Sequence, residues 1–385
     1  MNENSPLTDE LLDRIHARAA TNDAENRFFT EDLEDLAQAG YLKALVPESF
    51  GGVGLSLRDT ARLQARLAGA APATALAVNM HLVWCGVAKL MHERGESSFD
   101  FILEEASAGE VFAFGLSEAG NDLVLFGSTT EAKPDPDGGY RYYGTKIFTS
   151  LSPVWTRLGT MGLDTTSADA PQIVYGFIDR AEGGFEIRRD WDTLGMRATQ
   201  SNTTHLTGAH APADRIVRRL APGPSADPLV FAIFANFELL IAAVYTGIGA
   251  RALDLAVDAA KRRTSLKNAG RSYAHDPDIR WRIASAAIDQ DALWPQLDAL
   301  TQDVDSGSDH GPDWFRHLVG MKVRATETAK RVVDEAIRVS GGSTFFTGNE
   351  LGRLYRDVIA GLFHPSDDES AHNTVANALL GPLEL

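Results

Sequence analysis

Residues 338–369 decide the fold, and they read RVSGGSTFFTGNELGRLYRDVIAGLFHPSDDE. A long helical pattern ends there at Gly341-Gly342, which supply the positive φ that a helix C-terminus often needs. A second helical run follows a short turn-rich link and ends at His364-Pro365, because proline disfavours helix in the residue before it. An acidic segment and a last amphipathic helix close the chain. Taken alone, this pattern is equally typical of an ordinary corner in a helical bundle, so the rest of the chain must decide its meaning.

The composition bounds the class of protein. A chain of 385 residues is long for one hydrophobic core, so two or three domains are expected. The net charge of −17 argues against nucleic acid as a partner. Cys85 is the single cysteine and the ten histidines lack metal-binding spacing, so neither an intrachain disulfide nor a metal site is predicted. Residues 1–10 carry no charged-then-apolar leader, and a cytoplasmic protein is expected.

Three blocks of different texture follow one another along the chain. Residues 1–110 are helical in pattern, with Thr8 placed to cap the first helix. Residues 111–221 contain short β-rich runs, such as VFAFGLSE and QIVYGFID, separated by turn-forming residues. Residues 222–385 are helical again, with four substantial helices joined by short links. The blocks predict an α+β fold with an N-terminal helical domain, a central small β-barrel and a C-terminal four-helix bundle.

One apolar run is long enough to cross a membrane. Residues 229–250 read LVFAIFANFELLIAAVYTGIGA. Asn236 and Glu238 lie near its middle, where an ionisable group is costly in lipid, and the helical pattern continues beyond it. We therefore expect no membrane span but a central bundle helix, with Glu238 as a carboxylate on an otherwise apolar face.

Several ordered segments carry local patterns that can be compared with known families. They are LVPESFGGVGLSL after the first helices, FAFGLSEAGNDL and YRYYGTKIFTS in the β block, LGMRATQSNTTHLTGAH where the chain leaves it, and the Gly-Gly corner with LYRD. Together they resemble the acyl-CoA dehydrogenase superfamily of flavoproteins over nearly the whole chain. The resemblance implies an oxidoreductase with FAD between the barrel and the bundle. The chain lacks a nucleophile elbow, a P-loop and a dinucleotide-binding glycine motif, which removes the usual competing interpretations.

The resemblance also implies which residues hold the flavin. Ser117 stands where the family commonly has a threonine that bonds the ring, Phe148 where it often has a tryptophan, and Ser150 where it has a threonine. In the family an arginine of a partner subunit reaches the pyrophosphate, which implies a homotetramer or homodimer with Arg263 in that role. The full set implied for the cofactor is Phe114, Leu116, Ser117, Phe148, Ser150, Arg263, Ser265, Arg338, Gly341 and Gly342.

The catalytic base is where the chain departs from the family. α,β-Dehydrogenation of an acyl thioester removes an α-proton as hydride passes to FAD N5, and it needs a desolvated carboxylate beside the ring. The family's usual glutamate lies eight residues after the Asp of an Arg-Asp pair, and Pro365 occupies that position here. Glu238 is one replacement, since some members place the base on the long helix, and His364 is another. Asn121 best matches the family's substrate-contacting serine.

Three hypotheses for function remain open. The leading one is an acyl-CoA dehydrogenase-like enzyme acting on an acyl thioester, with electron-transfer flavoprotein as its partner. The second follows a branch of the superfamily that uses O2 and reduced FMN or FAD from a flavin reductase to oxygenate a small organic substrate. His364 with Ser150 or Ser117 fits that branch, and His81 would be a second polar group in the pocket. The third is a catalytically inactive flavin-fold binding protein.

Overall fold

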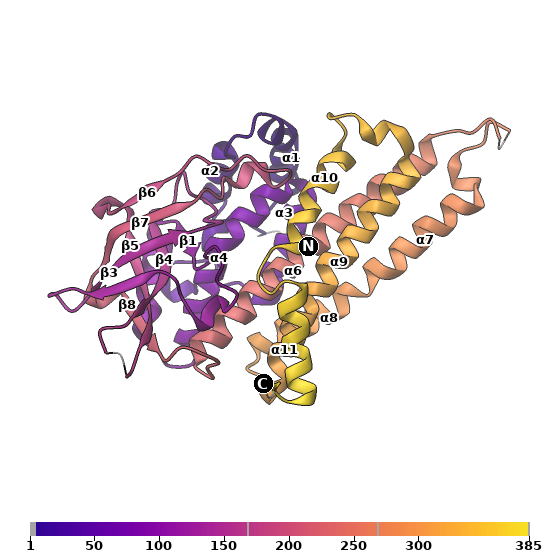
Figure 1. Cartoon of the computed structure of the whole chain (residues 1–385). Helices are drawn as coiled ribbons and strands as arrows, with labels where there is room; N and C mark the ends of the chain where they lie inside the picture. Colours follow the sequence, from indigo (N-terminus) through magenta and orange to yellow (C-terminus); the bar gives the residue numbers. More distant parts are fainter. Residues whose placement is uncertain (1–4, 168, 268, 384–385) are drawn as a thin grey trace.

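The computed structural model describes residues 5–167, 169–267 and 269–383; in chain order a group of strands follows one group of helices and precedes another, and in space the sheet lies at one end of the molecule (Figure 1). This order confirms the predicted α+β fold. The side chain of Thr8 accepts a hydrogen bond from the backbone N–H of Leu11, so the predicted cap of the first helix is confirmed. The first helical group comprises α1 (Asp9–Ala24), α2 (Thr30–Gln38), α3 (Leu57–Ala70), α4 (Pro72–Glu93) and α5 (Asp100–Ala108).

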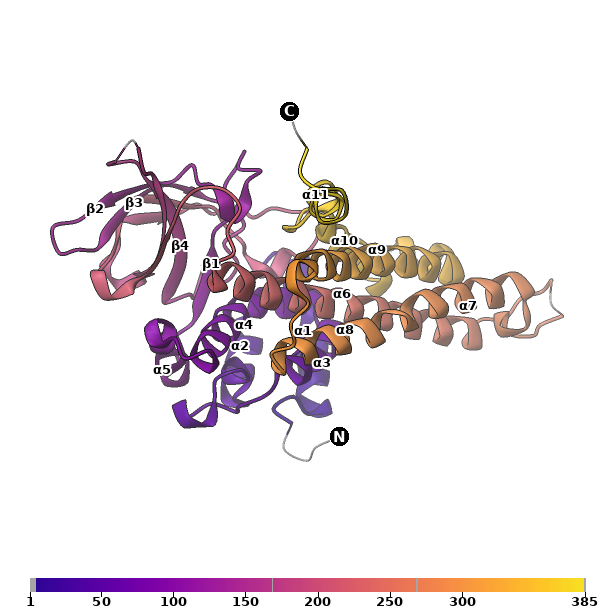
Figure 2. The ribbon, with the colours of Figure 1, turned by 90° about the horizontal axis from the view of Figure 1, so that it is seen from below.

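The eight strands form one mixed sheet in the order β6-β7-β3-β2-β4-β5-β8, with β1 parallel to β4. Figure 2 shows the sheet beside the N-terminal helices, away from the long C-terminal ones. The strands are β1 (Phe112–Gly115), β2 (Glu131–Pro134), β3 (Tyr140–Lys146), β4 (Arg157–Asp164), β5 (Gln172–Asp179), β6 (Phe185–Ile187), β7 (Thr204–Ala211) and β8 (Ile216–Leu220).

A buried ion pair ties the loop after β1 to the end of β3. The Lys146 ammonium donates to Glu118 Oε1 at 2.6 Å, and neither side chain is exposed. Burial opposes ionisation of Glu118, but the ion pair with Lys146 and the hydrogen bonds from backbone N–H groups outweigh this effect. They lower the pKa of Glu118 to about 2. The backbone N–H of Ile147 donates to the carbonyl of Ser117 at 3.0 Å. These contacts fix the segment that leads from β1 to the candidate active site.

The second helical group surrounds one central helix. Its elements are α6 (Pro228–Arg262), α7 (Pro277–Asp291), α8 (Leu293–Asp305), α9 (Trp314–Ser340), α10 (Glu350–Val358) and α11 (Asp368–Leu380). Helices α4 and α6 are apolar and long enough to cross a membrane by composition, yet 94% and 89% of their most apolar windows are buried inside the protein. The burial supports the predicted bundle helix for residues 229–250, because protein rather than lipid covers its apolar faces. The division into three domains stays a prediction.

The corner of residues 338–369 begins as expected and ends differently. Helix α9 ends at Ser340, and its cap residue Gly341 has a φ of 72°, a positive value that glycine adopts without strain. Helix α10 ends at Val358 rather than at His364, and a 3₁₀ turn (Ile359–Leu362) replaces its last turn. A buried lysine provides the reason, because Lys322 of α9 donates to the carbonyls of the segment that follows this turn.

Candidate active site

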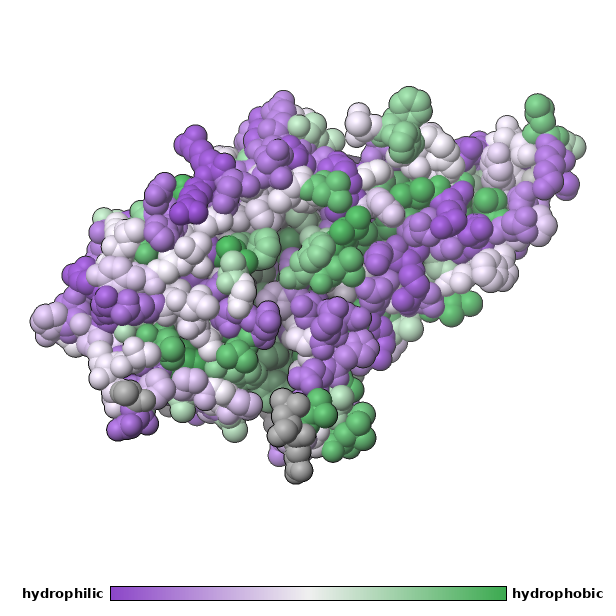
Figure 3. Space-filling model, viewed as in Figure 1, coloured by the Kyte–Doolittle hydropathy of each residue, from purple (hydrophilic) through white to green (hydrophobic). Residues whose placement is uncertain are grey.

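One cavity gathers several of the predicted site residues and is called the main cavity for that reason; it has a volume of about 370 Å³ and lies where the sheet meets α6, α10 and the segment after α10. Phe114 of β1 and Phe237 of α6 stack with ring centroids 5.5 Å apart and form part of its wall. Figure 3 shows apolar residues on both sides of a recess between the sheet and the C-terminal helices. The cavity has the size and apolar character of a small-molecule site. Phe114, Ser117, Phe148, Ser150 and His364 all line it, so the structure brings these five predicted residues together.

Phe148 is an exposed aromatic side chain on strained backbone. Its φ of 57° is unusual for a bulky residue, and Leu151 three positions later has a φ of 65°. Such conformations cost about 1–3 kcal/mol each and concentrate at functional sites. The ring of Phe148 remains half-exposed and meets Trp191 edge-on at 6.0 Å. The pair therefore offers one aromatic side of a slot that a flat ring system can enter.

Hydroxyl groups form the polar side of the same slot. Ser150 Oγ lies 2.8 Å from Ser201 Oγ, which in turn lies 2.7 Å from Thr199 Oγ1. Thr199 donates to the carbonyl of Met196, so the chain of hydroxyls is anchored at one end. Serine hydroxyls donate and accept, and this network can therefore bind the carbonyl or nitrogen edge of a heteroaromatic ring. The donor set suits a flavin ring without any charged residue.

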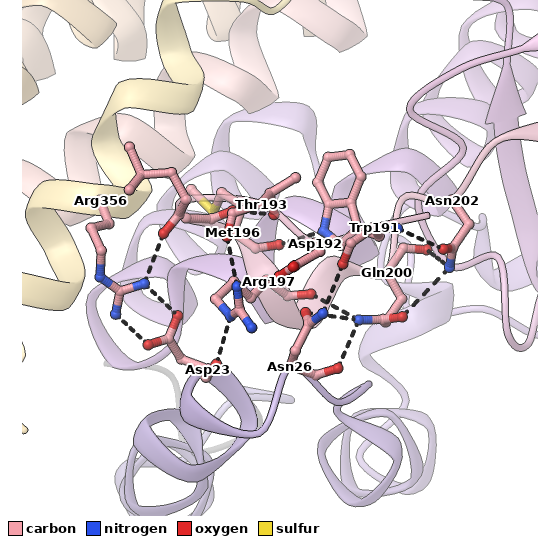
Figure 4. Close-up of polar contacts among 12 residues, drawn as sticks. Asp23, Asn26, Trp191, Asp192, Thr193, Met196, Arg197, Gln200, Asn202 and Arg356 are labelled. Atoms are coloured by element: carbon pink, nitrogen blue, oxygen red, sulfur yellow. Dashed lines mark hydrogen bonds and ion pairs between the residues drawn. The ribbon is translucent and has the colours of Figure 1, made fainter. Parts of the chain in front are cut away.

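A loop of residues 189–197 forms another wall and is fastened to two helices (Figure 4). The backbone N–H of Met196 donates to Asp357 Oδ1 at 2.6 Å, and Arg356 donates to the carbonyl of Leu194 at 2.8 Å. Arg356 also forms a two-pronged ion pair with Asp23 of α1. Burial raises the pKa of Asp357 to about 6. The Arg-Asp pair of α10 thus joins α1, α10 and the cavity wall.

His364 is the ionisable side chain that faces the main cavity from the segment after α10. Its Nε2 lies 2.8 Å from the hydroxyl of Tyr245 on α6. Burial, with a contribution from the nearby Lys322 ammonium, lowers the pKa of His364 to about 3. The imidazole is therefore neutral at pH 7. A neutral imidazole with so low a pKa is a weak base but an effective hydrogen-bonding group.

A second cavity of about 210 Å³ adjoins the first and shares Phe114, Ser117, Phe237 and Pro365 with it. Leu116 and Glu238 line this second cavity. Glu238 Oε1 accepts hydrogen bonds from the hydroxyl and backbone N–H of Ser366 at 2.8 and 3.3 Å. Oε2 is buried without a hydrogen-bond partner among the residues that the structure describes. Burial raises the pKa of Glu238 to about 7, although Lys322 and Ser366 oppose the shift.

Lys322 is a functional candidate that the sequence reasoning missed. Its ammonium donates to the carbonyls of Gly361, His364 and Ser366 at 3.2, 3.0 and 2.7 Å, and the residue is 1% exposed. These three bonds hold the short segment that separates the two cavities. The sequence carries no signal for this role, because a lysine on a helix usually faces solvent and its partners lie about forty residues further along the chain.

Two predicted substrate residues have other duties in this structure. His81 is fully buried: its Nε2 lies 2.7 Å from the carbonyl of Leu42 and its Nδ1 accepts the backbone N–H of Phe112 at 3.1 Å. Asn121 donates to Glu118 and to the carbonyl of Gly127, both at 2.9 Å, and so folds its own loop. Neither residue lines the two cavities. Internal partners occupy their polar atoms, so the structure does not support the predicted substrate contacts, which stay predictions.

The residues expected to reach a pyrophosphate lie elsewhere. Glu238 and Arg263 are 25 positions apart on α6 and its cap, which at 1.5 Å per residue separates them by about 37 Å. Arg263 donates to the carbonyls of Val339 and Ser340 and lies over Tyr273. Ser265, Arg338, Gly341 and Gly342 belong to the same end of the bundle and line neither cavity. Their contact with a cofactor across a subunit interface stays a prediction.

One close group of potential metal ligands lies on the sheet. Asp135, Asp137 and His210 bring their ligand atoms within 4.8 Å of one another near the β2–β3 hairpin turn. His210 already pairs with Asp137 at 2.9 Å and with Glu182 at 3.2 Å. These carboxylates are partly exposed, and surface groups of this kind are common without an ion. We assign no metal site to this group.

Known proteins match the chain over almost its whole length. Two family models match it, "Acyl-CoA dehydrogenase, N-terminal domain" over residues 8–96 and "Acyl-CoA dehydrogenase, C-terminal domain" over residues 239–368. The putative acyl-CoA dehydrogenase YdbM of Bacillus subtilis (strain 168) is 29% identical over 385 residues, which cover 96% of this chain and 94% of that protein. The amino sugar nitrososynthase RubN8 of Streptomyces rubradiris is 29% identical over 372 residues, covering 93% and 84%. The X-ray structure of KijD3 with FMN and a dTDP-linked amino sugar has a TM-score of 0.81 and 26% identity, covering 97% of this chain and 92% of that one.

Proposed function

The chain belongs to the acyl-CoA dehydrogenase superfamily of flavoproteins, and from this premise we propose that it is a flavin-dependent monooxygenase. It would use O2 and a reduced flavin to oxygenate a small organic substrate. A solved relative at 26% identity carries FMN, and one of the most similar sequences is an amino sugar nitrososynthase. Flavin reductase would be the partner that delivers the reduced cofactor. This proposal reverses the order of the two leading hypotheses from the sequence.

The residues of the main cavity fit a flavin. The aromatic pair Phe148–Trp191 offers a face for the ring system, and the hydroxyls of Ser150 and Ser117 can bond its polar edge. Strained backbone at Phe148 holds this aromatic group exposed to the cavity, which a purely structural core residue would not require. When bound, the reduced flavin supplies two electrons to O2, so that one oxygen atom enters the substrate and the other leaves as water.

The position of His364 in the wall of the main cavity is the observation that carries the proposal. Its side chain is the only imidazole or carboxyl group among the described residues that line the main cavity. Removal of an α-proton needs a base, and a histidine whose pKa is about 3 cannot provide one. Its neutral N–H or nitrogen can instead exchange a hydrogen bond with oxygen bound beside it, while Tyr245 fixes the ring. His364 thus orients the oxygen reaction, and the apolar walls exclude water.

Dehydrogenation by Glu238 is the second candidate. The unpartnered Oε2 of this buried carboxylate and its pKa of about 7 are the properties of a base for a carbon acid. Glu238 lines the neighbouring cavity, which shares Phe114 and Phe237 with the main one. In that reaction an acyl thioester would occupy the second cavity and electron-transfer flavoprotein would be the partner.

An oxygen-isotope experiment separates the two candidates. The protein would be supplied with FMN or FAD, NADH and a flavin reductase under ¹⁸O2, and small organic compounds would be screened for products that gain one ¹⁸O atom. We expect such a product and no anaerobic bleaching of the oxidised, flavin-loaded protein by acyl-CoA compounds. Anaerobic bleaching by an acyl-CoA, without any ¹⁸O-labelled product, would overturn the monooxygenase proposal and support Glu238 as a base.

We further propose a homodimer or homotetramer. Phe345 and Phe346 follow the Gly-Gly corner and are 95% and 76% exposed, which is unusual for two adjacent phenylalanines. Burial of both rings against a second copy would place the interface near Arg263, which bonds the end of α9 just before these rings. Light scattering should give an oligomer, and replacement of both phenylalanines by serine should shift it toward monomer.

A further inference from the structure

The charged residues that line the second cavity are acidic. Its charged lining residues are Asp122 and Glu238, and no lysine, arginine or histidine lies among the described residues that form its wall. The remaining polar lining comes from Ser117, Ser366 and the α11 side chains Ser370, Asn373 and Thr374. A carboxylate or phosphate brought here would meet like charge without a cationic partner. An anionic substrate is therefore disfavoured at this site.

The two carboxylate oxygens of Glu238 differ in their hydrogen bonds. Ser366 bonds Oε1 through both its hydroxyl and its backbone N–H, whereas Oε2 has no partner among the described residues and the side chain is 2% exposed. A buried carboxylate oxygen without a donor is destabilising unless a ligand or water supplies one.

The nearby lysine does not neutralise this carboxylate by direct contact. Lys322 uses its three donors on the carbonyls of Gly361, His364 and Ser366. Its charge acts on Glu238 only through space, because no ion pair within 4.0 Å joins them in the part of the chain that the structure describes. The second oxygen of Glu238 therefore has no donor among the described residues, and the residue lines the cavity.

The rest of the wall sets the size and polarity of the ligand. Phe234, Phe237, Ile233 and Leu125 supply apolar surface, and the cavity volume is about 210 Å³. We propose that the second cavity binds a small apolar primary amine, whose ammonium group pairs with Oε2 of Glu238. The inference rests on the proposed function in one respect, since the shared wall with the main cavity makes this amine the substrate that is oxygenated.

The carboxylate then has a defined chemical role. Glu238 accepts one proton from the bound ammonium group, which leaves the amine nitrogen with a free electron pair. Oxygenation of that nitrogen replaces one N–H bond by N–OH: the amine, O2, two electrons and two protons give the hydroxylamine and one water. Reduced flavin supplies the electrons, as in the proposed function. Asp122, which lines the same cavity, adds negative charge that favours the cation during entry.

The test compares three ligands of nearly the same shape. Calorimetric titration of the flavin-loaded protein at pH 8 would use isobutylamine, isobutanol and isobutyrate. We expect the amine to bind at least tenfold more tightly than the alcohol and the carboxylate to bind weakest. Glu238→Gln should reduce amine affinity at least tenfold and leave alcohol affinity within about twofold, whereas Glu104→Gln, at an exposed position of α5 outside both cavities, should change neither. A carboxylate or alcohol that binds as tightly as the amine would overturn the proposal, as would a Glu238→Gln protein that still prefers the amine.

Folding and turnover are measured separately from binding. Thermal melting and flavin content of the Glu238→Gln protein identify a variant that fails to fold, and Asp122→Asn then supplies a second variant, expected to weaken amine binding by about threefold. If amines bind selectively but no ¹⁸O enters them, the binding proposal stands and the monooxygenase proposal fails. If ¹⁸O enters neutral substrates and amines are not preferred, the reverse holds.

Discussion

The hydroxyl of Tyr245 lies 2.8 Å from Nε2 of His364, and this contact joins the central helix α6 to the segment that separates the two cavities. Burial raises the pKa of Tyr245 well above 10 and lowers that of His364 to about 3, so both partners are neutral at every pH at which the protein is expected to work. The pair therefore carries no charge over this pH range. Its role is to hold the imidazole in one orientation.

Tyr245→Phe should uncouple oxygen consumption from product formation. The variant leaves the buried Nε2 of His364 without its partner, and the loss of one such bond costs about 1–3 kcal/mol. We expect product formed per reduced flavin consumed to fall about tenfold, with hydrogen peroxide formed instead. Tyr142→Phe is the matched control, because it also loses one hydrogen bond of a buried tyrosine, to the carbonyl of Val174 at 3.3 Å, but lies in the sheet. Equal coupling in both variants would contradict an orienting role for Tyr245.

Glu238 should make the protein less stable as pH rises from about 4.5 to about 7. Its pKa is about 7 in the folded protein against an ordinary value of 4.5, so the folded state holds more protons than the unfolded state in this window. Because stability falls with pH wherever the folded state binds more protons, the loss reaches up to about 3 kcal/mol above pH 7. Urea unfolding of the wild type and of Glu238→Gln at pH 5 and pH 8 measures this loss of unfolding free energy. The variant should gain stability relative to the wild type only at pH 8.

A parallel pH dependence in the two proteins would show that Glu238 has no raised pKa. Asp357 has a raised pKa of about 6 and shifts stability in the same direction, but it is present in both proteins and cancels in the difference.

Local patterns in the sequence predict much of the fold and only part of the site. The cap at Thr8, the β-rich block and the positive φ at Gly341 depend on neighbours within a few residues, and the structure confirms each of them. Phe148 and Ser150 follow from position in the resembling segments, and they reach the main cavity. Lys322 could not be predicted, since its role depends on carbonyls of a segment that returns to it only after the fold is complete.

His81 is a residue whose place the sequence alone does not decide. Its sequence context, an apolar helix, is compatible both with a buried structural histidine and with a pocket residue, and no local pattern separates the two. Only the position of the Leu42 carbonyl and the Phe112 N–H decides the matter, because they occupy both ring nitrogens.

Arg356→Lys should loosen the cavity wall and weaken flavin binding. Arg356 bonds both carboxylate oxygens of Asp23 and the carbonyl of Leu194, a set that a single ammonium cannot reproduce. We expect flavin affinity to fall about tenfold, which corresponds to ~1.4 kcal/mol. Fluorescence titration with FMN and FAD measures the change. Arg331→Lys, at a more exposed pair with Asp289, is the control, and the same loss in both variants would exclude a specific role for Arg356.

Lys322→Met should disturb both cavities at once. Without the ammonium, the carbonyls of Gly361, His364 and Ser366 lose their donor, and we expect unfolding free energy to fall by about 3–5 kcal/mol. The charge of Lys322 also lowers the pKa of Glu238. Its removal should therefore raise that pKa above 7 and extend upward the pH range over which Glu238 lowers stability. Urea unfolding of this variant from pH 5 to pH 9, with and without Glu238→Gln, measures this pH range. Lys330→Met, at a less buried position on the same helix α9, is the control. An unchanged pH range would show that Lys322 acts only on the segment of residues 361–366 and has no electrostatic effect on Glu238.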